Sequence, residues 1–253
     1  IITGAILGAI LAARVAKKRG LDPEIVWDIV PWVLIAGIIG ARLWHVLTPD
    51  STMLIDGKNP YFLRPLEIFN IRNGGLGIPG GVMAGAVALW IYCRKKGISF
   101  ARWLDILAPG LVLAQAIGRW GNFVNQEVYG LPSNLPWAIK IDAAHRLPQY
   151  MDVERYHPTF LYEFIWNLIN MGILLWIGSR FKNKLKDGDV FLVYMLIYAI
   201  GRFMLEFIRI VNSPVAGLNS NQTLMGVIAV ASTIALIVRH RAAKTPETTV
   251  SES

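Results

Sequence analysis

The sequence is poor in charged residues and has almost no cysteine. Only 17% of its 253 residues are charged and 54% are hydrophobic, so it lacks the polar surface that a soluble domain of this length needs. Its one cysteine, Cys93, excludes an intrachain disulfide and a metal site built on several thiolates. The histidines show no metal-ligand spacing with one another or with acidic residues. We therefore predict no metal and no cofactor.

The hydrophobic residues form long blocks separated by short polar segments, a pattern typical of membrane-spanning helices. A span needs about 20 mostly apolar residues. The blocks predict an all-α, polytopic integral membrane protein of about seven transmembrane helices. The expected spans are Ile1–Ala13, Ile25–Leu47, Gly80–Tyr92, Ala101–Ile117, Thr159–Ile177, Val190–Ile208 and Leu224–Val238. The third is short and must take residues from the glycine-rich stretch before it.

The blocks indicate one domain. We expect residues 1–244 to form a single transmembrane domain and residues 245–253 a disordered cytoplasmic tail, which is polar and rich in serine and threonine. The segment 131–158 contains four prolines and several charges, which predicts a surface excursion rather than a span. The sequence starts at Ile1 inside an apolar run and without methionine, so we expect the start of the first helix to be missing.

The basic residues predict an orientation in the membrane. The formal net charge is +8, but the basic residues cluster at alternate helix ends and form no stripe interleaved with aromatics, so we predict no nucleic-acid binding. Basic clusters mark cytoplasmic loops, which places the N-terminus outside and the C-terminus inside. The loops around residues 48–79, 118–158 and 209–223 then face outward. Because the polar residues of interest lie in or next to them, we expect a polar cavity open towards the outer face.

An ionisable group lies within the sixth expected span. Arg202 and Glu206 are four positions apart, which places them on one helical face, and Arg209 follows three positions later. Ionisable residues inside a membrane are costly and usually face a partner or a cavity. One interpretation is a charge-neutral pair that holds two helices together. The other is an arginine that binds an anionic headgroup and is oriented by the glutamate.

Residues 118–130 form the densest polar cluster. Arg119 can bind two phosphate oxygens through parallel hydrogen bonds. Asn122 and Asn125 offer neutral donors and acceptors, and the glycines allow close backbone approach. The alternative is a polar helix cap with an arginine whose charge extends to the interface.

Three further features are candidates. Residues 73–81 are too glycine-rich for a regular helix and resemble a broken segment that lines a polar cavity. Backbone N–H groups in this segment could cradle a phosphate, and tight helix packing is an equal alternative. Glu163, about one turn into the fifth span, is a candidate acceptor for an arginine of another helix. Arg42 either extends to the interface or binds lipid.

Three motifs together resemble the prolipoprotein diacylglyceryl transferase family. They are Gly118-Arg119-x-Gly121-Asn122-Phe123-x-Asn125-x-Glu127-x-x-Gly130, His157-Pro158-Thr159-x-Leu161-Tyr162-Glu163 and Gly201-Arg202-Phe203-x-x-Glu206-Phe207-x-Arg209. Agreement in order and spacing extends over nearly the whole chain. Two departures matter: the family commonly has a histidine where this chain has Pro79, and it has a functional tyrosine that would precede Ile1. Neither role is carried over to this chain.

The resemblance implies an enzyme of the bacterial plasma (inner) membrane. Such an enzyme transfers the sn-1,2-diacylglyceryl group of phosphatidylglycerol to the lipobox cysteine of a prolipoprotein signal peptide, forms a thioether and releases glycerol 1-phosphate. The resemblance implies that Arg119 and Arg202 are catalytic and stabilise the leaving phosphate, with Glu206 orienting Arg202. The substrate-binding residues that it implies are Arg119, Asn122, Asn125, Glu127, Gly130, Arg209, Gly80 and Gly81.

Three other functions fit the same polar residues. A phospholipid transporter or scramblase would use the arginines to guide headgroups and would move lipid without a covalent product. In a structural protein the charges would only pair helices, so removing Arg119 would reduce stability rather than chemistry. Another lipid-modifying enzyme, such as a phospholipid acyltransferase, is disfavoured by the Gly-Arg-x-Gly-Asn motif, through the resemblance alone.

Overall fold

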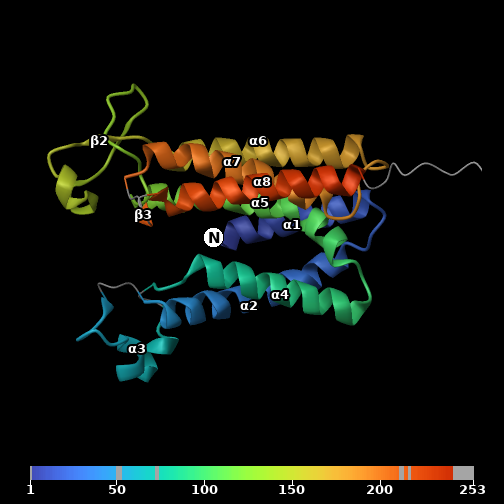
Figure 1. The fold of residues 1–253 in the computed structure, drawn as a ribbon, viewed down its shortest axis with the longest axis horizontal. Coiled ribbons are helices and arrows are strands. Elements are labelled where there is room, and N and C mark those ends of the chain that lie inside the picture. Colours follow the sequence, from blue (N-terminus) through green and yellow to red (C-terminus); the bar gives the residue numbers. More distant parts are fainter. Residues whose placement is uncertain (1, 50–52, 72–73, 211–213, 216–217, 242–253) are drawn as a thin grey trace, which may run out of the picture. The chain divides into compact units, whose positions relative to one another are not determined.

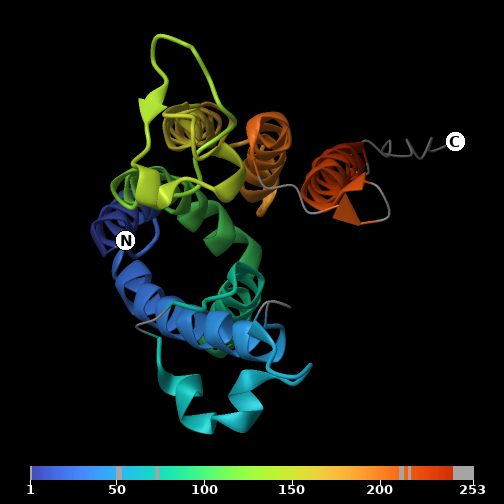
Figure 2. The ribbon, with the colours of Figure 1, turned by 90° about the vertical axis from the view of Figure 1, so that its left-hand side faces the viewer.

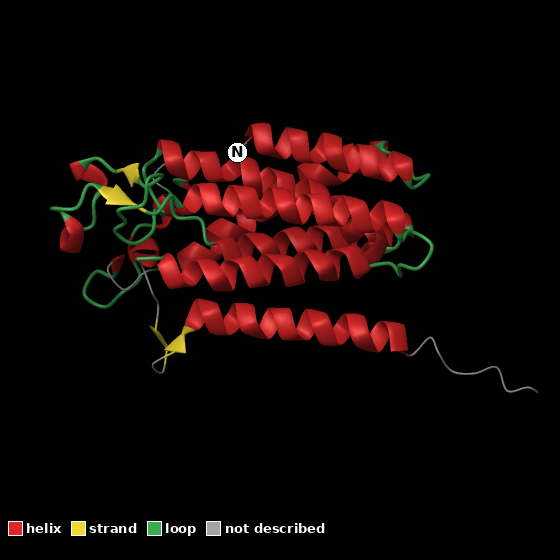
Figure 3. Cartoon of the chain, turned by 90° about the horizontal axis from the view of Figure 1, so that it is seen from above, coloured by secondary structure: helices red, strands yellow, loops and turns green. Residues whose placement is uncertain are grey.

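The computed structural model describes residues 2–49, 53–71, 74–210, 214–215 and 218–241, and they are mostly helical (Figure 1). The α-helices are α1 (Ile2–Lys18), α2 (Glu24–Leu47), α3 (Pro60–Leu63), α4 (Ile78–Lys96), α5 (Phe100–Val124), α6 (Thr159–Arg180), α7 (Asp189–Leu205) and α8 (Ser220–Arg241). Short 3-10 helices lie at η2 (Pro65–Phe69), η3 (Ala143–His145), η4 (Pro148–Tyr150) and η5 (Glu206–Ile208). The strands, yellow in Figure 3, are β1 (Ile139–Lys140), β2 (Arg155–Tyr156), β3 (Pro214–Val215) and β4 (Leu218–Asn219).

The helices are those of a membrane protein. Within the described residues, five helical segments are long and apolar enough to cross a bilayer: α2, α5, α6, α7 with η5, and α8. In the 18-residue apolar stretch of each helix, only 22% of α2 and 6% of α8 is buried in the protein. Apolar side chains therefore cover the outer faces of these helices, as lipid-facing helices require. The two remaining predicted spans are also helical, as α1 with 17 residues and α4 with 19.

The chain divides into two compact units, residues 13–103 and residues 1–12 with 104–253. In the first unit α2 packs against α4 through glycines (Figure 1). A Cβ atom added to Gly40 would lie 2.5 Å from the carbonyl oxygen of Gly80, and one added to Gly80 only 2.2 Å from that of Gly40. Small residues let membrane helices approach to backbone contact. These glycines are therefore needed for the crossing itself.

Adding a side chain at Gly80 should disrupt the α2–α4 crossing. Because the obstacle is backbone, we expect Gly80→Ala to lower the free energy of unfolding by about 1–3 kcal/mol, measured by thermal unfolding in detergent. Gly172→Ala in α6 is the matched control, since nothing lies within 4 Å of a Cβ added there. The control should be neutral or slightly stabilising. An equal effect of the two substitutions would contradict the packing role.

In the second unit, α7 lies between α6 and α8 and packs against both. Its core joins α5, α6 and α7 through fully or largely buried side chains, namely Ala108, Val112, Leu174, Val190 and Tyr194. At the C-terminal end of α8, Arg239 Nε lies 3.2 Å from Asp189 Oδ1, and His240 Nε2 lies 2.8 Å from Asp189 Oδ2. These contacts fix the last turn of α8 to the first residue of α7.

The segment after α5 is a folded excursion, which confirms that residues 131–158 are not a span. It lies at one end of α5 and α6 (Figures 1 and 2) and is held by the antiparallel pair β1–β2, with Ile139 opposite Tyr156. The Tyr156 side chain is fully buried, and its hydroxyl lies 2.9 Å from the carbonyl oxygens of Tyr150 and Val153. Burial raises the pKa of Tyr156, so the phenol remains a protonated donor to these carbonyls.

One predicted boundary was wrong. The fourth span was expected to end at Ile117, but α5 continues to Val124, so the polar residues that follow Ile117 belong to its last two turns. The third span was expected to begin at Gly80 and to take residues from the glycine-rich stretch before it, and α4 does begin at Ile78, so only the part of residues 73–81 before Ile78 is not helical. Pro79 is tolerated in the first turn because its missing N–H would have no partner there.

Candidate functional site: a buried arginine–carboxylate network

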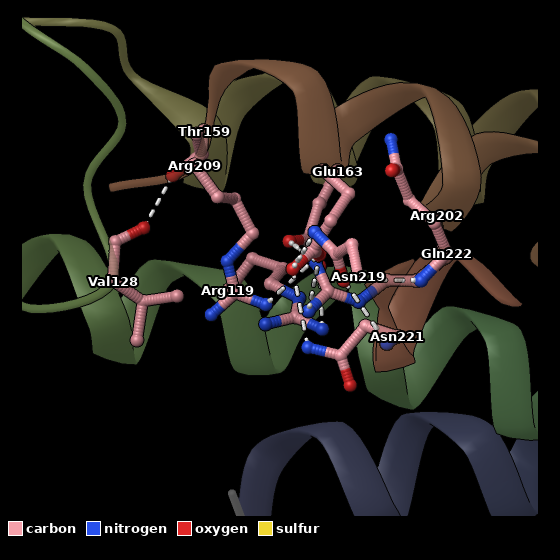
Figure 4. Close-up of polar contacts among 10 residues, drawn as sticks. Arg119, Val128, Thr159, Glu163, Arg202, Arg209, Asn219, Asn221 and Gln222 are labelled. Carbon is pink, nitrogen blue, oxygen red and sulfur yellow. Dashed lines mark hydrogen bonds and ion pairs between the residues drawn. The ribbon is translucent and has the colours of Figure 1, made fainter. Parts of the chain in front are cut away.

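Five ionisable side chains meet where α5, α6 and α7 approach one another (Figure 4). Arg119 comes from α5, Glu163 from α6 and Arg202 from α7, while Glu206 and Arg209 lie on and just after η5. We call this set the arginine network. All five residues belong to the unit that contains residues 104–253.

Glu163 joins two helices through two arginines. Its Oε2 lies 2.5 Å from Arg119 Nη2, and its Oε1 lies 3.4 Å from Arg202 Nη1. The Glu163 side chain is only 6% exposed, so these contacts replace the water that the carboxylate loses on burial. The expectation that Glu163 accepts an arginine of another helix is confirmed for both α5 and α7.

Glu206 is the centre of the other half of the network. Its Oε2 lies 3.6 Å from Arg202 Nη2 and 3.7 Å from Arg209 Nη1, and its side chain is completely buried. The expectation that Arg202 and Glu206 share a helical face is thereby confirmed. Within the described residues Oε2 has no partner at hydrogen-bond distance, so the two arginines are near it without being tightly bound. Arg202 Nη2 and Arg209 Nη1 therefore contact Glu206 Oε2 by charge and not by a hydrogen bond.

The network carries one unit of positive charge in excess, because three arginines face two glutamates. Arg119, Arg202 and Arg209 retain side-chain exposures of 25%, 16% and 20%, whereas both carboxylates are at most 6% exposed. Among these five side chains the accessible part is thus cationic and the buried part anionic. Exposed guanidinium groups are suited to binding phosphate oxygens.

The polar residues after Arg119 extend the network along the end of α5. Asn122 Oδ1 accepts a hydrogen bond from Arg119 Nη1 at 3.3 Å, and Asn122 Nδ2 donates to Glu127 Oε1 at 3.0 Å. Asn125 Nδ2 also donates to Glu127 Oε1, at 3.3 Å. The three side chains therefore fix one another and leave Arg119 oriented by both Asn122 and Glu163.

A strained turn places the excursion beside the network. Val128 has a φ of 55°, an unfavourable conformation for a β-branched residue, and its carbonyl oxygen accepts a hydrogen bond from Thr159 Oγ1 (Figure 4). Next to it, Gly130 N donates to His157 O at 2.9 Å. A Cβ atom on Gly130 would lie 2.7 Å from the carbonyl oxygen of Ile208. Gly130 thus permits close packing of the excursion against the ends of α6 and η5.

Gly80 and Gly81, which were also predicted to bind substrate, lie in the other unit at the α2–α4 crossing. The adjacent loop is organised by Arg42, whose side chain is bound within the protein. Its Nε donates to Ile68 O at 2.7 Å, its Nη1 to Gly74 O and Gly75 O at 3.0 Å, and its Nη2 to Glu67 O at 2.5 Å. Arg42 is only 7% exposed, so the interpretation that it extends to the interface was wrong.

Two residues of the site, Asn219 and Asn221 at the start of α8, were not predicted from the sequence. Asn221 Nδ2 donates to Glu206 Oε1 at 3.1 Å, and Asn219 Nδ2 does so at 3.4 Å. The Asn219 side chain also accepts from the backbone N–H groups of Asn221 and Gln222, which caps the helix. A polar Asn-Ser-Asn-Gln run directly before an apolar block was the available signal.

Removing the amide of Asn221 should weaken the site. We expect Asn221→Leu to lower the free energy of unfolding by about 1–3 kcal/mol, because Glu206 Oε1 loses its shorter hydrogen bond while fully buried. Thermal unfolding of the purified protein measures this change. Thr233→Val on the same helix is the control, because its exposed hydroxyl donates to Ala229 O of its own helix. If both variants unfold at the wild-type temperature, Asn221 does not support Glu206.

The fold and the network define a class of protein: a helical membrane protein in which three partly exposed arginines contact two buried carboxylates. Comparison with known sequences identifies the family. Residues 1–239 match the family model of prolipoprotein diacylglyceryl transferase, and the chain belongs to that family.

The similar proteins carry the same name, phosphatidylglycerol–prolipoprotein diacylglyceryl transferase. The one from Frankia alni is 42% identical over 243 residues, which are 95% of this chain and 62% of that protein. The one from Chloroflexus aggregans is 41% identical over 223 residues (83% of this chain, 70% of that protein), and the one from Gloeobacter violaceus 40% over 230 (90% and 82%). The chain thus spans less than two thirds of the Frankia alni protein.

Proposed function

We propose that this protein transfers the sn-1,2-diacylglyceryl group of phosphatidylglycerol to the lipobox cysteine of prolipoproteins. The observation that carries the proposal is the arginine network, whose members lie in the motifs that resemble the family. Phosphatidylglycerol has one phosphodiester with a single negative charge, which complements the one excess positive charge of the network. The names of the relatives support the same donor and acceptor.

The proposed reaction is a displacement at carbon. The cysteine thiolate of the prolipoprotein attacks the terminal glyceryl carbon of the donor, a C–S bond forms, and the bond from that carbon to the phosphate oxygen breaks. The phosphate leaves with the bond electrons as glycerol 1-phosphate, and the thiol proton passes to solvent. Arg119 and Arg202 stabilise the charge that grows on the phosphate oxygen. Nearby arginines also lower the pKa of a thiol, which favours the attacking thiolate.

The remaining site residues hold these arginines. Glu163 fixes Arg119 and Arg202 at a common point, and Glu206 faces Arg202 and Arg209. Asn122, Asn125 and Glu127 shape the side of the site that takes the headgroup glycerol, and Gly130 brings the excursion close to them. That Gly80 and Gly81 bind substrate through their backbone is a separate proposal, which concerns the unit of residues 13–103 alone.

Mass spectrometry of a lipobox peptide tests the reaction. The full-length protein in liposomes receives phosphatidylglycerol and the peptide, and the expected product is the peptide plus one diacylglyceryl group. The gain should disappear when the peptide cysteine becomes serine. Protein that is folded but yields no adduct, under conditions in which lipid is accessible, would overturn the proposal.

We also propose that α1 and α4 cross the membrane, which gives seven spans with the site towards the outer side. Supporting this, basic residues occupy the last turns of α1, α4, α6 and α8, which alternate along the predicted path. In a Cys93→Ser background, a cysteine at Asp152 in the excursion should react with an impermeant maleimide added to intact cells, and one at Lys184 should not. The reverse pattern would contradict this orientation.

A further inference from the structure

A column of polar side chains continues from the arginine network into the helix bundle. On α5, Gln115 precedes Arg119 by one helical turn. On α6, Asn167 and Asn170 follow Glu163, and on α7, Tyr194 and Tyr198 precede Arg202 at intervals of four residues. We call Gln115, Asn167, Asn170, Tyr194 and Tyr198 the polar column. Asn167 is 4% exposed, Tyr194 is 5% exposed and Asn170 is fully buried.

The packing places part of this column in one layer. Val112, Leu174 and Val190 pack with Tyr194 in a common apolar core. Because α6 runs opposite to α5 and α7, Gln115 lies about one turn nearer the network than Val112, and Asn170 lies about one turn nearer than Leu174. Gln115 Nε2 donates to the Tyr194 hydroxyl at 2.9 Å, which joins α5 to α7 at this level.

Three polar atoms of this layer lack a partner. Gln115 Oε1, Asn170 Nδ2 and Asn170 Oδ1 are buried and have no hydrogen-bond partner among the described residues. A buried polar atom without a partner costs about 1–3 kcal/mol, and native proteins usually satisfy such atoms with ordered water. The three atoms need both a donor and an acceptor. Water supplies both, whereas an ion of either sign supplies only one.

We propose that the polar column binds water molecules at the level of Gln115, Asn170 and Tyr194, and that this internal hydration site continues to Glu163. The bound water satisfies the two amides and hydrates the arginine network from its membrane-interior side. Charged groups in a bilayer are costly unless they meet a partner or water. The bound water therefore lowers the free-energy cost of placing these charged side chains in the bilayer, whether or not the protein catalyses the proposed transfer.

Hydroxyl-radical footprinting of the full protein in nanodiscs detects such water, because radiolysis labels side chains next to bound water even when they are buried. Tyr194, 5% exposed, should be labelled several-fold more than Trp103, which is 2% exposed and has a more reactive ring. Equal or weaker labelling of Tyr194 would overturn the proposal. The measurement uses the wild-type protein, so it does not depend on a variant that folds.

Asn170→Leu, which keeps the side-chain size, should change Tm in opposite directions depending on whether the polar column binds water. If water is bound, the substitution removes two of its partners, so labelling of Tyr194 should fall several-fold and Tm should drop by roughly 2–4 °C. If the column is dry, the substitution removes two unpaired atoms and Tm should rise, which would overturn the proposal. Met171→Leu at the adjacent, apolar position is the matched control and should leave both readouts unchanged.

Discussion

Arg119→Ala and Arg202→Ala should each reduce diacylglyceryl transfer by at least about 100- to 1000-fold while the protein still folds and inserts. Each substitution removes a fixed cation at the point where the phosphate oxygen gains charge. Both arginines contact Glu163, at 2.5 and 3.4 Å, but they come from different helices, α5 and α7. The measurement is the rate of adduct formation on the lipobox peptide, followed by mass spectrometry.

Arg146→Ala is the matched control for these variants. Arg146 lies in the excursion and bonds to the carbonyl oxygens of Ile141 and Met151, remote in the sequence from the network motifs. The variant should retain transfer. Wild-type rates in folded Arg119→Ala or Arg202→Ala protein would show that the arginines have only a structural role.

Glu163→Leu should cause the largest loss of stability among the site variants. The substitution leaves Arg119 without its closest ion-pair partner and Arg202 without one of two, and it replaces a carboxylate whose side chain is only 6% exposed. Removing one member of a buried ion pair costs about 3–5 kcal/mol, because the remaining charge is uncompensated. Thermal unfolding in detergent, monitored at several protein concentrations, measures this loss.

Glu154→Leu is the control for the stability measurement. Glu154 pairs with Lys140 at 3.2 Å, but both side chains are about 60% exposed (59% and 64%), so the loss should stay below about 1 kcal/mol. If the two glutamate variants unfold at the same temperature, burial adds nothing to the Glu163 pairs. The arginines would then be held by other contacts.

The spanning helices were predictable because each depends on a local pattern. The apolar block at 25–47 gave α2 within one residue at its start, and the spacing of Arg202 and Glu206 gave their contact. Glu163 was found because a carboxylate one turn inside an apolar helix needs a cationic partner. In these cases one segment contains the whole signal.

Other contacts depend on segments distant in the sequence and could not be predicted. Glu206 contacts Asn221 only because α8 packs on α7, and neither segment contains a pattern that predicts this contact. Likewise Arg42 donates to four carbonyl groups of a loop more than twenty residues away in the sequence. The sequence alone predicted that this side chain binds lipid or extends to the interface. The end of α5 was misplaced because polar residues interrupt the apolar pattern without interrupting the helix.

The lone cysteine has a consequence for the proposed reaction, whose acceptor is a thiol. Cys93 is 1% exposed and lies in the last turns of α4, in the unit of residues 13–103, whereas the arginine network belongs to the other unit. An accessible thiol of the enzyme itself would compete with the substrate cysteine, and burial removes Cys93 from that competition. Incubation with phosphatidylglycerol alone should leave the mass of the intact protein unchanged. Self-modification at Cys93 would mean that this position opens to lipid.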